Sequence, residues 1–272
     1  MRTRYISLLP VLCVGALTFG AGVAQAGDAA VSDINIKLSA FGGGLNEGTS
    51  SEHPGTSESE GFGGVAGSLT LPLHERLGLQ FDVAGAWERG ESFLDAGAHL
   101  FWRDPGTGLF GLYGGFAHHH ALGGQQVRRI GVEAERYSGK MTYVGALGYE
   151  NGDGNTGLYG HAKLDYYWTP NLMTSSGFTY EGTGFYASRI EWQLRSDDTI
   201  GFTLFTDSNV HSSDNYTFLA GVRMTIGEDM SLMDRHRHQD PSDYLGADLI
   251  ATEQGEAKRC GGGACTAPPT PQ

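Results

Sequence analysis

The stretch GLYGHAKLDYYW, residues 157–168, decides the fold. Successive side chains of a β-strand point to opposite faces, so this stretch divides into two sets. One set is apolar and ends in aromatic residues: Leu158, Ala162, Leu164, Tyr166 and Trp168. The other set carries the polar and ionisable groups: Tyr159, His161, Lys163, Asp165 and Tyr167. The alternation predicts a strand with two different faces, which a soluble sheet and a membrane barrel could both use.

The same alternation recurs through most of the chain in segments of similar length. Together with 157–168, the predicted strands cover residues 33–44, 62–73, 77–88, 93–103, 109–118, 127–136, 141–150, 172–181, 185–195, 199–207 and 216–227. Two of them, 109–118 and 172–181, alternate less regularly. Alternating segments of about ten residues, separated by turns, are the signature of a transmembrane β-barrel. We therefore predict an all-β fold, a transmembrane antiparallel up-and-down barrel of about twelve strands over residues 27–227, in preference to a secreted soluble β-protein.

The first 26 residues are typical of a secretory signal peptide. Arg2 and Arg4 precede an apolar run over 6–19, and Ala24-Gln25-Ala26 offers a small-residue cleavage site. The apolar run is too short for a helix that spans a bilayer. An exported chain that forms a barrel is expected in the outer membrane of a Gram-negative bacterium, so we predict that location.

The expected strand length and connections agree with an outer-membrane barrel. A strand of about eleven residues, rising roughly 3.3 Å per residue and tilted near 40°, gains about 28 Å of height, close to the apolar band of such barrels. Alternate connections should then be short periplasmic turns, at 74–76, 104–108, 137–140, 169–171 and 196–198. The other connections are expected to be mostly longer, with a long polar loop at 45–60 and loops at 119–126, 151–156 and 208–215. Two of that set, at 89–92 and 182–184, are short.

Three segments resemble a known family. They are HLFWRDPGTGLFGLYGG (99–115), IGVEAERYSGKMTYVGALGYE (130–150) and SLMDRHRHQDPSDYL (231–245). They are similar to a family of poorly characterised, porin-like proteobacterial outer-membrane barrels, and the resemblance covers most of the mature chain. These motifs mark turns and strands rather than a reaction, so the resemblance implies fold and location but no activity.

The polar faces of the predicted strands carry charges of both signs. The residues expected to line the lumen are Asp82, Asp95, His99, Arg103, Arg129, Glu133, His161, Lys163, Asp165, Arg189, Glu191 and Arg223. Such charges either line water or pair across the barrel, because an unpaired buried charge is costly. Twelve strands lie between small barrels that side chains fill and porins that leave a channel. We expect a narrow, charged lumen that passes small solutes, or alternatively a structural or surface-interaction barrel without a pore.

Two histidine motifs raise other chemistry. His118, His119 and His120 are consecutive, so at most two can converge on a metal from one strand, and we expect a polar loop rim instead. His211 and Ser213 have the spacing of the His-x-Ser pair used by lipid A deacylases and outer-membrane phospholipases, in which histidine activates the serine hydroxyl. Their polar surroundings favour an exposed loop. We expect neither an enzyme nor a cofactor or metal, and keep lipid acyl hydrolysis as a further alternative.

Residues 228–272 lack the alternation and end in Gly- and Pro-rich sequence. We expect a largely flexible periplasmic tail with a short helix near 231–237. Cys260 and Cys265 are predicted to form a disulfide in the oxidising periplasm, since their four-residue separation is not that of a dithiol active site. The net charge of −13 argues against a nucleic-acid partner. The expected partners are outer-membrane lipid and, during insertion, the barrel-assembly machinery, and we expect a monomer.

Overall fold

The computed structural model describes residues 29–47, 58–88, 91–119, 125–152, 156–182, 184–197, 199–212, 215–227 and 229–241. In this part of the chain the strands are β1 (Asn35–Glu47), β2 (Glu58–His74), β3 (Leu77–Glu88), β4 (Glu91–Asp104), β5 (Gly108–His119), β6 (Gln125–Ser138), β7 (Met141–Gly152), β8 (Thr156–Thr169), β9 (Leu172–Glu181), β10 (Gly184–Asp197), β11 (Ile200–Ser212) and β12 (Asn215–Ile226). One short helix follows them, α1 (Leu232–His238). No described helix is long and apolar enough to cross a membrane.

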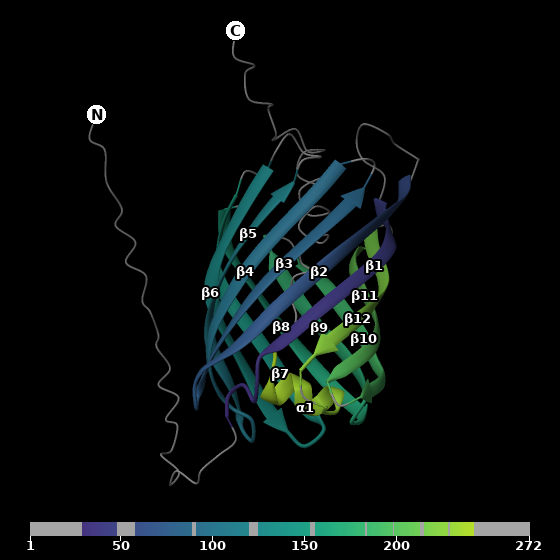
Figure 1. Ribbon diagram of the computed structural model, residues 1–272. Helices are drawn as coiled ribbons and strands as arrows, with labels where there is room; N and C mark the ends of the chain where they lie inside the picture. Colours follow the sequence, from purple (N-terminus) through teal and green to yellow (C-terminus); the bar gives the residue numbers. More distant parts are fainter. Residues whose placement is uncertain are drawn as a thin grey trace, which may run out of the picture.

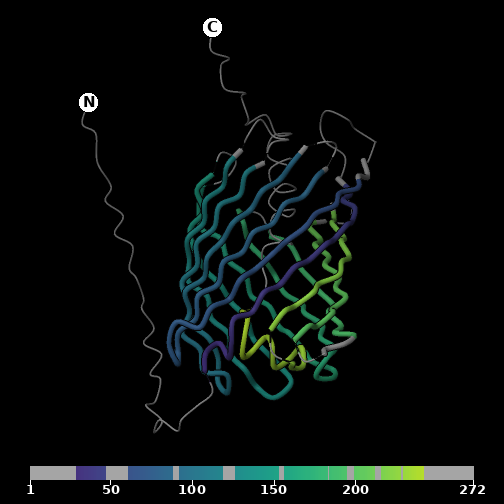
Figure 2. The backbone as a smooth tube through the Cα atoms, viewed as in Figure 1, coloured from purple at the N-terminus to yellow at the C-terminus, as the bar shows by residue number. Residues whose placement is uncertain are grey.

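The strands form a closed barrel (Figure 1). Each strand pairs antiparallel with the next one in sequence, and β1 pairs antiparallel with β12, from Ile36 opposite Ile226 to Asn46 opposite Tyr216. Figure 2 shows the seam as the purple first strand beside the yellow-green last strand. Closure leaves no strand edge without a partner, as lipid requires. The predicted twelve-stranded up-and-down barrel is therefore confirmed.

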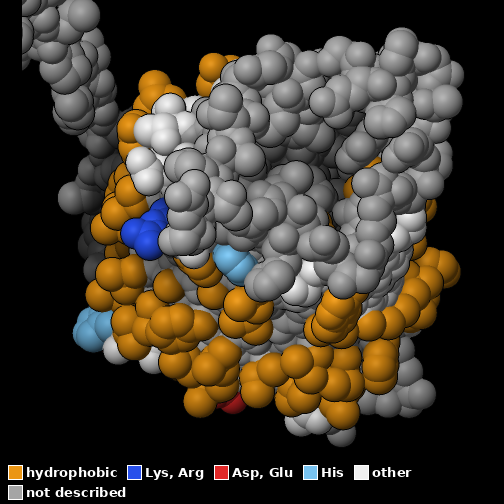
Figure 3. Space-filling model, turned by 90° about the horizontal axis from the view of Figure 1, so that it is seen from above, with side chains coloured by type: hydrophobic (Ala, Val, Ile, Leu, Met, Phe, Trp, Pro, Cys, Tyr) orange, Lys and Arg blue, Asp and Glu red, His pale blue; other side chains and the backbone are white. Residues whose placement is uncertain are grey.

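The two faces of each strand differ as the alternation predicts. In β8, Leu158 and Trp168 are exposed on the outer surface, at 64% and 58%, whereas Tyr159 and Asp165 are buried on the other face, at 1% and 5%. Large exposed hydrophobic side chains occur on every strand of the barrel. Seen along the barrel axis, hydrophobic side chains cover much of the described outer wall (Figure 3). The barrel thus presents a largely apolar outer surface and keeps most of its charged side chains inside.

The connections divide between the two ends of the barrel. At one end, called here the short-turn end, the strands are joined by residues 75–76, 105–107, 139–140, 170–171 and 198–199. At the opposite end they are joined by residues 48–57, 89–90, 120–124, 153–155, 182–183 and 213–214. The turn predicted at Asp104-Pro105-Gly106 is present, and the Asp104 carboxylate accepts a hydrogen bond from the Gly106 amide at 3.0 Å. Gly139 adopts a positive φ of 55°, which allows the tight turn between β6 and β7.

Two predicted loops are shorter than we expected. The polar loop at 45–60 is partly strand, because β1 and β2 continue to pair through Leu45 with Glu60 and Asn46 with Ser59. The loop at 208–215 is largely taken up by β11 and β12, so that only 213–214 separate them. Polar sequence indicated loops there, but ladder hydrogen bonds form regardless of side chain. The strands therefore run further at the opposite end than the alternation indicated.

Candidate functional site

The interior of the barrel is the candidate functional site, and the strand alternation positions its side chains. The structure places every predicted lumen-lining residue on an inward position: Asp82, Asp95, His99, Arg103, Arg129, Glu133, His161, Lys163, Asp165, Arg189, Glu191 and Arg223. Nine of them are buried, and Arg129, Lys163 and Arg189 are partly buried. A buried charge is tolerated only where it is paired and hydrogen-bonded, so the contacts between these residues decide what the interior can do.

His99 joins three strands in the first group of contacts. Its Nε2 lies 3.3 Å from the Asp82 carboxylate on β3, and its Nδ1 lies 2.9 Å from the Glu133 carboxylate on β6. The ring stacks on Tyr113 of β5, with centroids 5.6 Å apart. The Gln80 side-chain amide donates to both oxygens of Asp82 at 3.0 Å. The imidazole thus bridges two carboxylates that would otherwise face each other inside the barrel.

Arg129 organises a second group, on β6, β7 and β9. Its Nε donates to the Glu150 carboxylate at 2.7 Å, and its Nη2 lies 3.1 Å from the Glu181 carboxylate. The guanidinium also lies over the Tyr159 ring, 5.1 Å from its centroid. One cation therefore contacts two carboxylates from different strands.

A third group crosses β10, β11 and β12. Arg189 makes a two-pronged contact with Asp207, at 2.6 and 3.1 Å, and a third contact with Glu191 at 3.3 Å. Arg223 also donates to Glu191, at 3.0 Å, and stacks over Phe205 at 4.9 Å. Because charge-assisted bidentate pairs are the strongest hydrogen bonds in proteins, this group stiffens the wall that it lines.

The inner surface carries more acid than base. Among the side chains that the structure describes, nine inward carboxylates belong to Asp82, Asp95, Glu133, Glu135, Glu150, Asp165, Glu181, Glu191 and Asp207. Six inward basic side chains belong to Lys37, Arg103, Arg129, Lys163, Arg189 and Arg223. The difference is nine minus six, or three more carboxylates than lysine and arginine side chains. Sequence reasoning did not select Lys37, Glu150, Glu181 or Asp207, although the alternation puts Lys37, Glu150 and Asp207 on polar faces.

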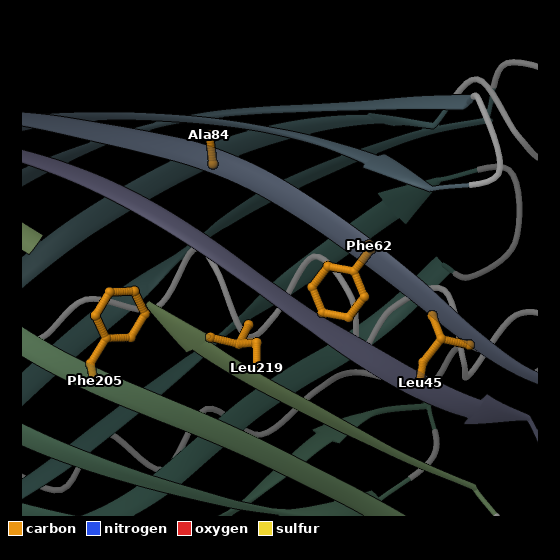
Figure 4. Close-up of a cluster of buried hydrophobic side chains, with 5 residues drawn as sticks. All are labelled: Leu45, Phe62, Ala84, Phe205 and Leu219. Carbon is orange, nitrogen blue, oxygen red and sulfur yellow. The ribbon is translucent and has the colours of Figure 1, made fainter. Parts of the chain in front are cut away.

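One part of the inner wall is apolar. Leu45, Phe62, Ala84, Phe205 and Leu219 form a cluster of buried residues (Figure 4). They come from β1, β2, β3, β11 and β12, which are neighbours around the barrel. The alternation did not identify Phe62 or Phe205 as inward-facing, so this cluster was not predicted from the sequence. The interior therefore combines charged groups with an apolar strip.

The segment after the last strand closes over the short-turn end. The predicted helix near 231–237 is present as α1, capped by the Ser231 hydroxyl, which accepts a hydrogen bond from the Asp234 amide at 3.2 Å. The Asp240 carboxylate lies 3.0 Å from Lys37 Nζ, and His236 Nδ1 lies 2.8 Å from the Tyr167 hydroxyl. Described residues 229–241 are thus packed against the barrel, which the expectation of a flexible tail did not anticipate.

Residues before β1 lie at the same end. The Ala30 amide donates to the Glu75 carbonyl at 2.7 Å, and the Ser32 amide donates to the His238 carbonyl at 2.9 Å. Arg103 reaches the Ala30 carbonyl from inside the barrel at 3.1 Å. Both ends of the described chain therefore meet at the short-turn end.

The histidine motifs do not form the sites considered for them. His118 lies opposite outward-facing Leu94 in the β4–β5 ladder and stacks on Phe116, with ring centroids 6.5 Å apart. The His119 side chain and His120 lie outside the described part. No group of three or more His, Cys, Asp or Glu residues that could hold a metal occurs among the described residues.

The acyl-hydrolase alternative requires His211 to face lipid. Its ring instead stacks on the buried Phe185 ring, with centroids 4.6 Å apart, so it faces the interior of the barrel. Its predicted partner Ser213 lies outside the described residues, as do the signal peptide and the predicted Cys260–Cys265 disulfide. His211, the one residue of the pair that the structure describes, therefore does not face lipid as the acyl-hydrolase alternative requires.

Comparison with known proteins identifies the fold. No family model and no curated protein matches the sequence. Among solved structures, an outer-membrane channel from Pseudomonas putida F1 is similar with a TM-score of 0.51 and 13% identity, covering 75% of this chain and 99% of that one. The translocator domain of the autotransporter NalP from Neisseria meningitidis is similar with a TM-score of 0.50 and 11% identity, covering 71% of this chain and 87% of that domain. The protein therefore has the fold of outer-membrane β-barrel proteins.

Proposed function

We propose that this protein is a porin-like channel in the outer membrane of a Gram-negative bacterium, passing small solutes with a preference for cations. The apolar outer wall and the barrel fold support the location, as does the resemblance of three segments to proteobacterial barrels. Short turns lie on the periplasmic side of such barrels, so the short-turn end faces the periplasm in this proposal. We propose a monomer, bounded by outer-membrane lipid and inserted by the barrel-assembly machinery.

The observation that carries the proposal is the composition of the inner wall. Nine described carboxylates face six lysine and arginine side chains there. A barrel that only served as a scaffold would need no surplus of one sign. Acidic side chains around a pore favour cations over anions. A surplus of carboxylates is therefore the composition that suits a path for cations.

Planar-bilayer recording tests the proposal. The refolded protein should give steady ion-conducting steps, and under a potassium chloride gradient its reversal potential should have the sign of a cation-selective pore. Lys163→Glu removes an inward positive charge and adds a negative one, so it should increase the cation preference. Trp168→Phe, on the outer face of the same strand, is the matched control and should leave selectivity unchanged.

Two results would overturn the proposal. An anion-selective reversal potential would contradict the role of the carboxylates. Silence at all voltages, both for the full chain and for a variant that lacks residues 228–272, would favour the alternative of a structural or surface-interaction barrel without a pore. The truncated variant is included because the segment after β12 lies across one end of the barrel.

A further inference from the structure

The segment that follows β12 spans the short-turn mouth from wall to wall. At one side Asp240 contacts β1, through Lys37 Nζ at 3.0 Å and the Asn35 side-chain amide at 2.6 Å. At the other side Arg237 donates to the Gly139 carbonyl, in the turn between β6 and β7, at 2.9 Å. Around the closed barrel, β7 lies six strands from β1 in either direction, so these contacts are on opposite walls. The segment therefore crosses the opening rather than following its rim.

Buried polar contacts hold the segment in this position. The side chains of Lys37 and Asp240 are only 4% and 2% exposed, so their ion pair is shielded from water. Arg235 is buried and donates to Gln239 at 2.7 Å and to Asn35 at 3.4 Å. Screening by salt weakens exposed ion pairs much more than buried ones, so these contacts persist at physiological ionic strength.

The helix within the segment contacts the barrel wall through both basic and apolar side chains. Its last turn contains four basic residues, Arg235 to His238, and His236 Nε2 lies 3.5 Å from Glu191 on the inner wall. On its apolar side, Leu232 packs with Tyr167 and Met173 in a buried cluster at the ends of β8 and β9. A basic helix is thus docked on an acid-rich interior through an apolar anchor.

We propose that residues 229–241 are a tethered plug that restricts passage through the periplasmic mouth, held shut by the Lys37–Asp240 ion pair. This inference rests on the proposed channel function and adds regulation to it. Because the plug is continuous with β12, its release leaves the barrel wall intact. Opening requires that the contacts to β1 and to the β6–β7 turn break and that the helix undocks from the ends of β8 and β9, which frees the segment to leave the mouth.

Two truncations separate the plug from the rest of the tail. A chain ending at residue 241 retains every plug contact described here, whereas a chain ending at residue 227 loses all of them. The shorter chain should conduct at least several-fold more than the full chain, and the chain ending at 241 should conduct like the full chain. If deletion of 242–272 alone raises conductance as much, the plug assignment is wrong. Heat-modifiable gel migration checks that each barrel is folded.

A charge exchange tests the ion pair in the full chain. Lys37→Asp places like charges at the β1 contact and should raise conductance, and Lys37→Asp combined with Asp240→Lys should return it to the starting level. Arg76→Asp is the matched control, because Arg76 pairs with Asp104 at 3.0 Å at the same end, without contact to the plug. Equal conductance of Lys37→Asp and the unaltered chain would overturn the plug. Silence of every variant, including the chain ending at 227, would instead overturn the channel function itself.

Discussion

A lysine placed at the lipid-facing position Leu164 should destabilise the inserted barrel, whereas removal of the adjacent inward lysine should leave its stability largely unchanged. Leu164 is 39% exposed on the outer face of β8, and Lys163 is partly buried on the inner face. We therefore compare Leu164→Lys with Lys163→Leu. The two changes affect neighbouring residues of one strand, so strand propensity and local backbone are matched, and only the face differs.

The expected loss of stability in Leu164→Lys follows from the depth of Leu164 in the membrane. Leu164 is five residues from Thr169, the end of β8 at the short turn. At roughly 3.3 Å per residue and a tilt near 40°, it lies about 13 Å above that end, which is half the height of an apolar band about 25 Å tall. A lysine at mid-depth costs about 2–4 kcal/mol. The ratio of folded to unfolded protein should then fall by about 30-fold to 700-fold.

Trp168 supplies a depth control on the same face. It is one residue from the end of β8, about 3 Å above it, where a lysine costs only about 0–1 kcal/mol. Urea titration in lipid vesicles, read by heat-modifiable gel migration, measures the free energy of unfolding. Equal losses for Leu164→Lys and Lys163→Leu would refute the assignment of faces, and an equal loss for Trp168→Lys would refute the assignment of depth.

Two further substitutions test a contact between inward side chains and a close approach between two strands. His99→Leu removes the ring that bridges Asp82 and Glu133 and should lower the free energy of unfolding by about 3–5 kcal/mol, because two buried carboxylates are left without the ring between them. A loss below about 1 kcal/mol in the same urea titration would contradict the bridge. Gly148→Ala places a methyl group against the paired backbone of β6 and should cost about 1–3 kcal/mol, whereas Gly157→Ala meets no atom within 4 Å. Equal stability of these two glycine variants would show that the close approach is absent.

The barrel could be predicted from the sequence because lipid imposes one rule on every strand. A lipid-facing position must be apolar, so period-two alternation reports the face of each residue. The weakly alternating segment 172–181 shows how the rule is relaxed. There the outward hydroxyl of Thr174 accepts a hydrogen bond from Trp168 Nε1 at 3.1 Å, and the outward hydroxyl of Ser176 pairs with that of Tyr186. Polar groups on the outer face are tolerated because neighbouring strands satisfy them.

The partners of the interior charges could not be predicted in the same way. Alternation gives the face of a residue but neither its height nor its neighbours across the curved wall. Arg129 on β6 reaches Glu181 on β9, and Arg223 on β12 reaches Glu191 on β10. Such contacts depend on the register of several successive ladders, which one strand's pattern does not contain.

The packing of the segment after β12 could not be predicted from the sequence either. A helix signal is visible in the sequence, since Ser231 precedes Asp234 by three residues, the spacing of a helix cap. The residues that hold the helix to the barrel gave no signal, because Asp240 and Lys37 come from opposite ends of the described chain. Only the closed seam between β1 and β12 brings Asp240 and Lys37 together, and nothing in the sequence predicts that contact.

That seam has a consequence for the order of folding. Asn35 and Asp240, which are hydrogen-bonded, are separated by 205 positions in sequence. We expect their contact to form once the first strand has met the last, because the seam between β1 and β12 brings the two residues together. An unfinished sheet, open at β1 and β12, offers the helix its contacts on β8 and β9 but does not yet bring Asn35 opposite Asp240. We therefore expect residues 229–241 to complete their docking after the barrel has closed, as a latch on the finished wall.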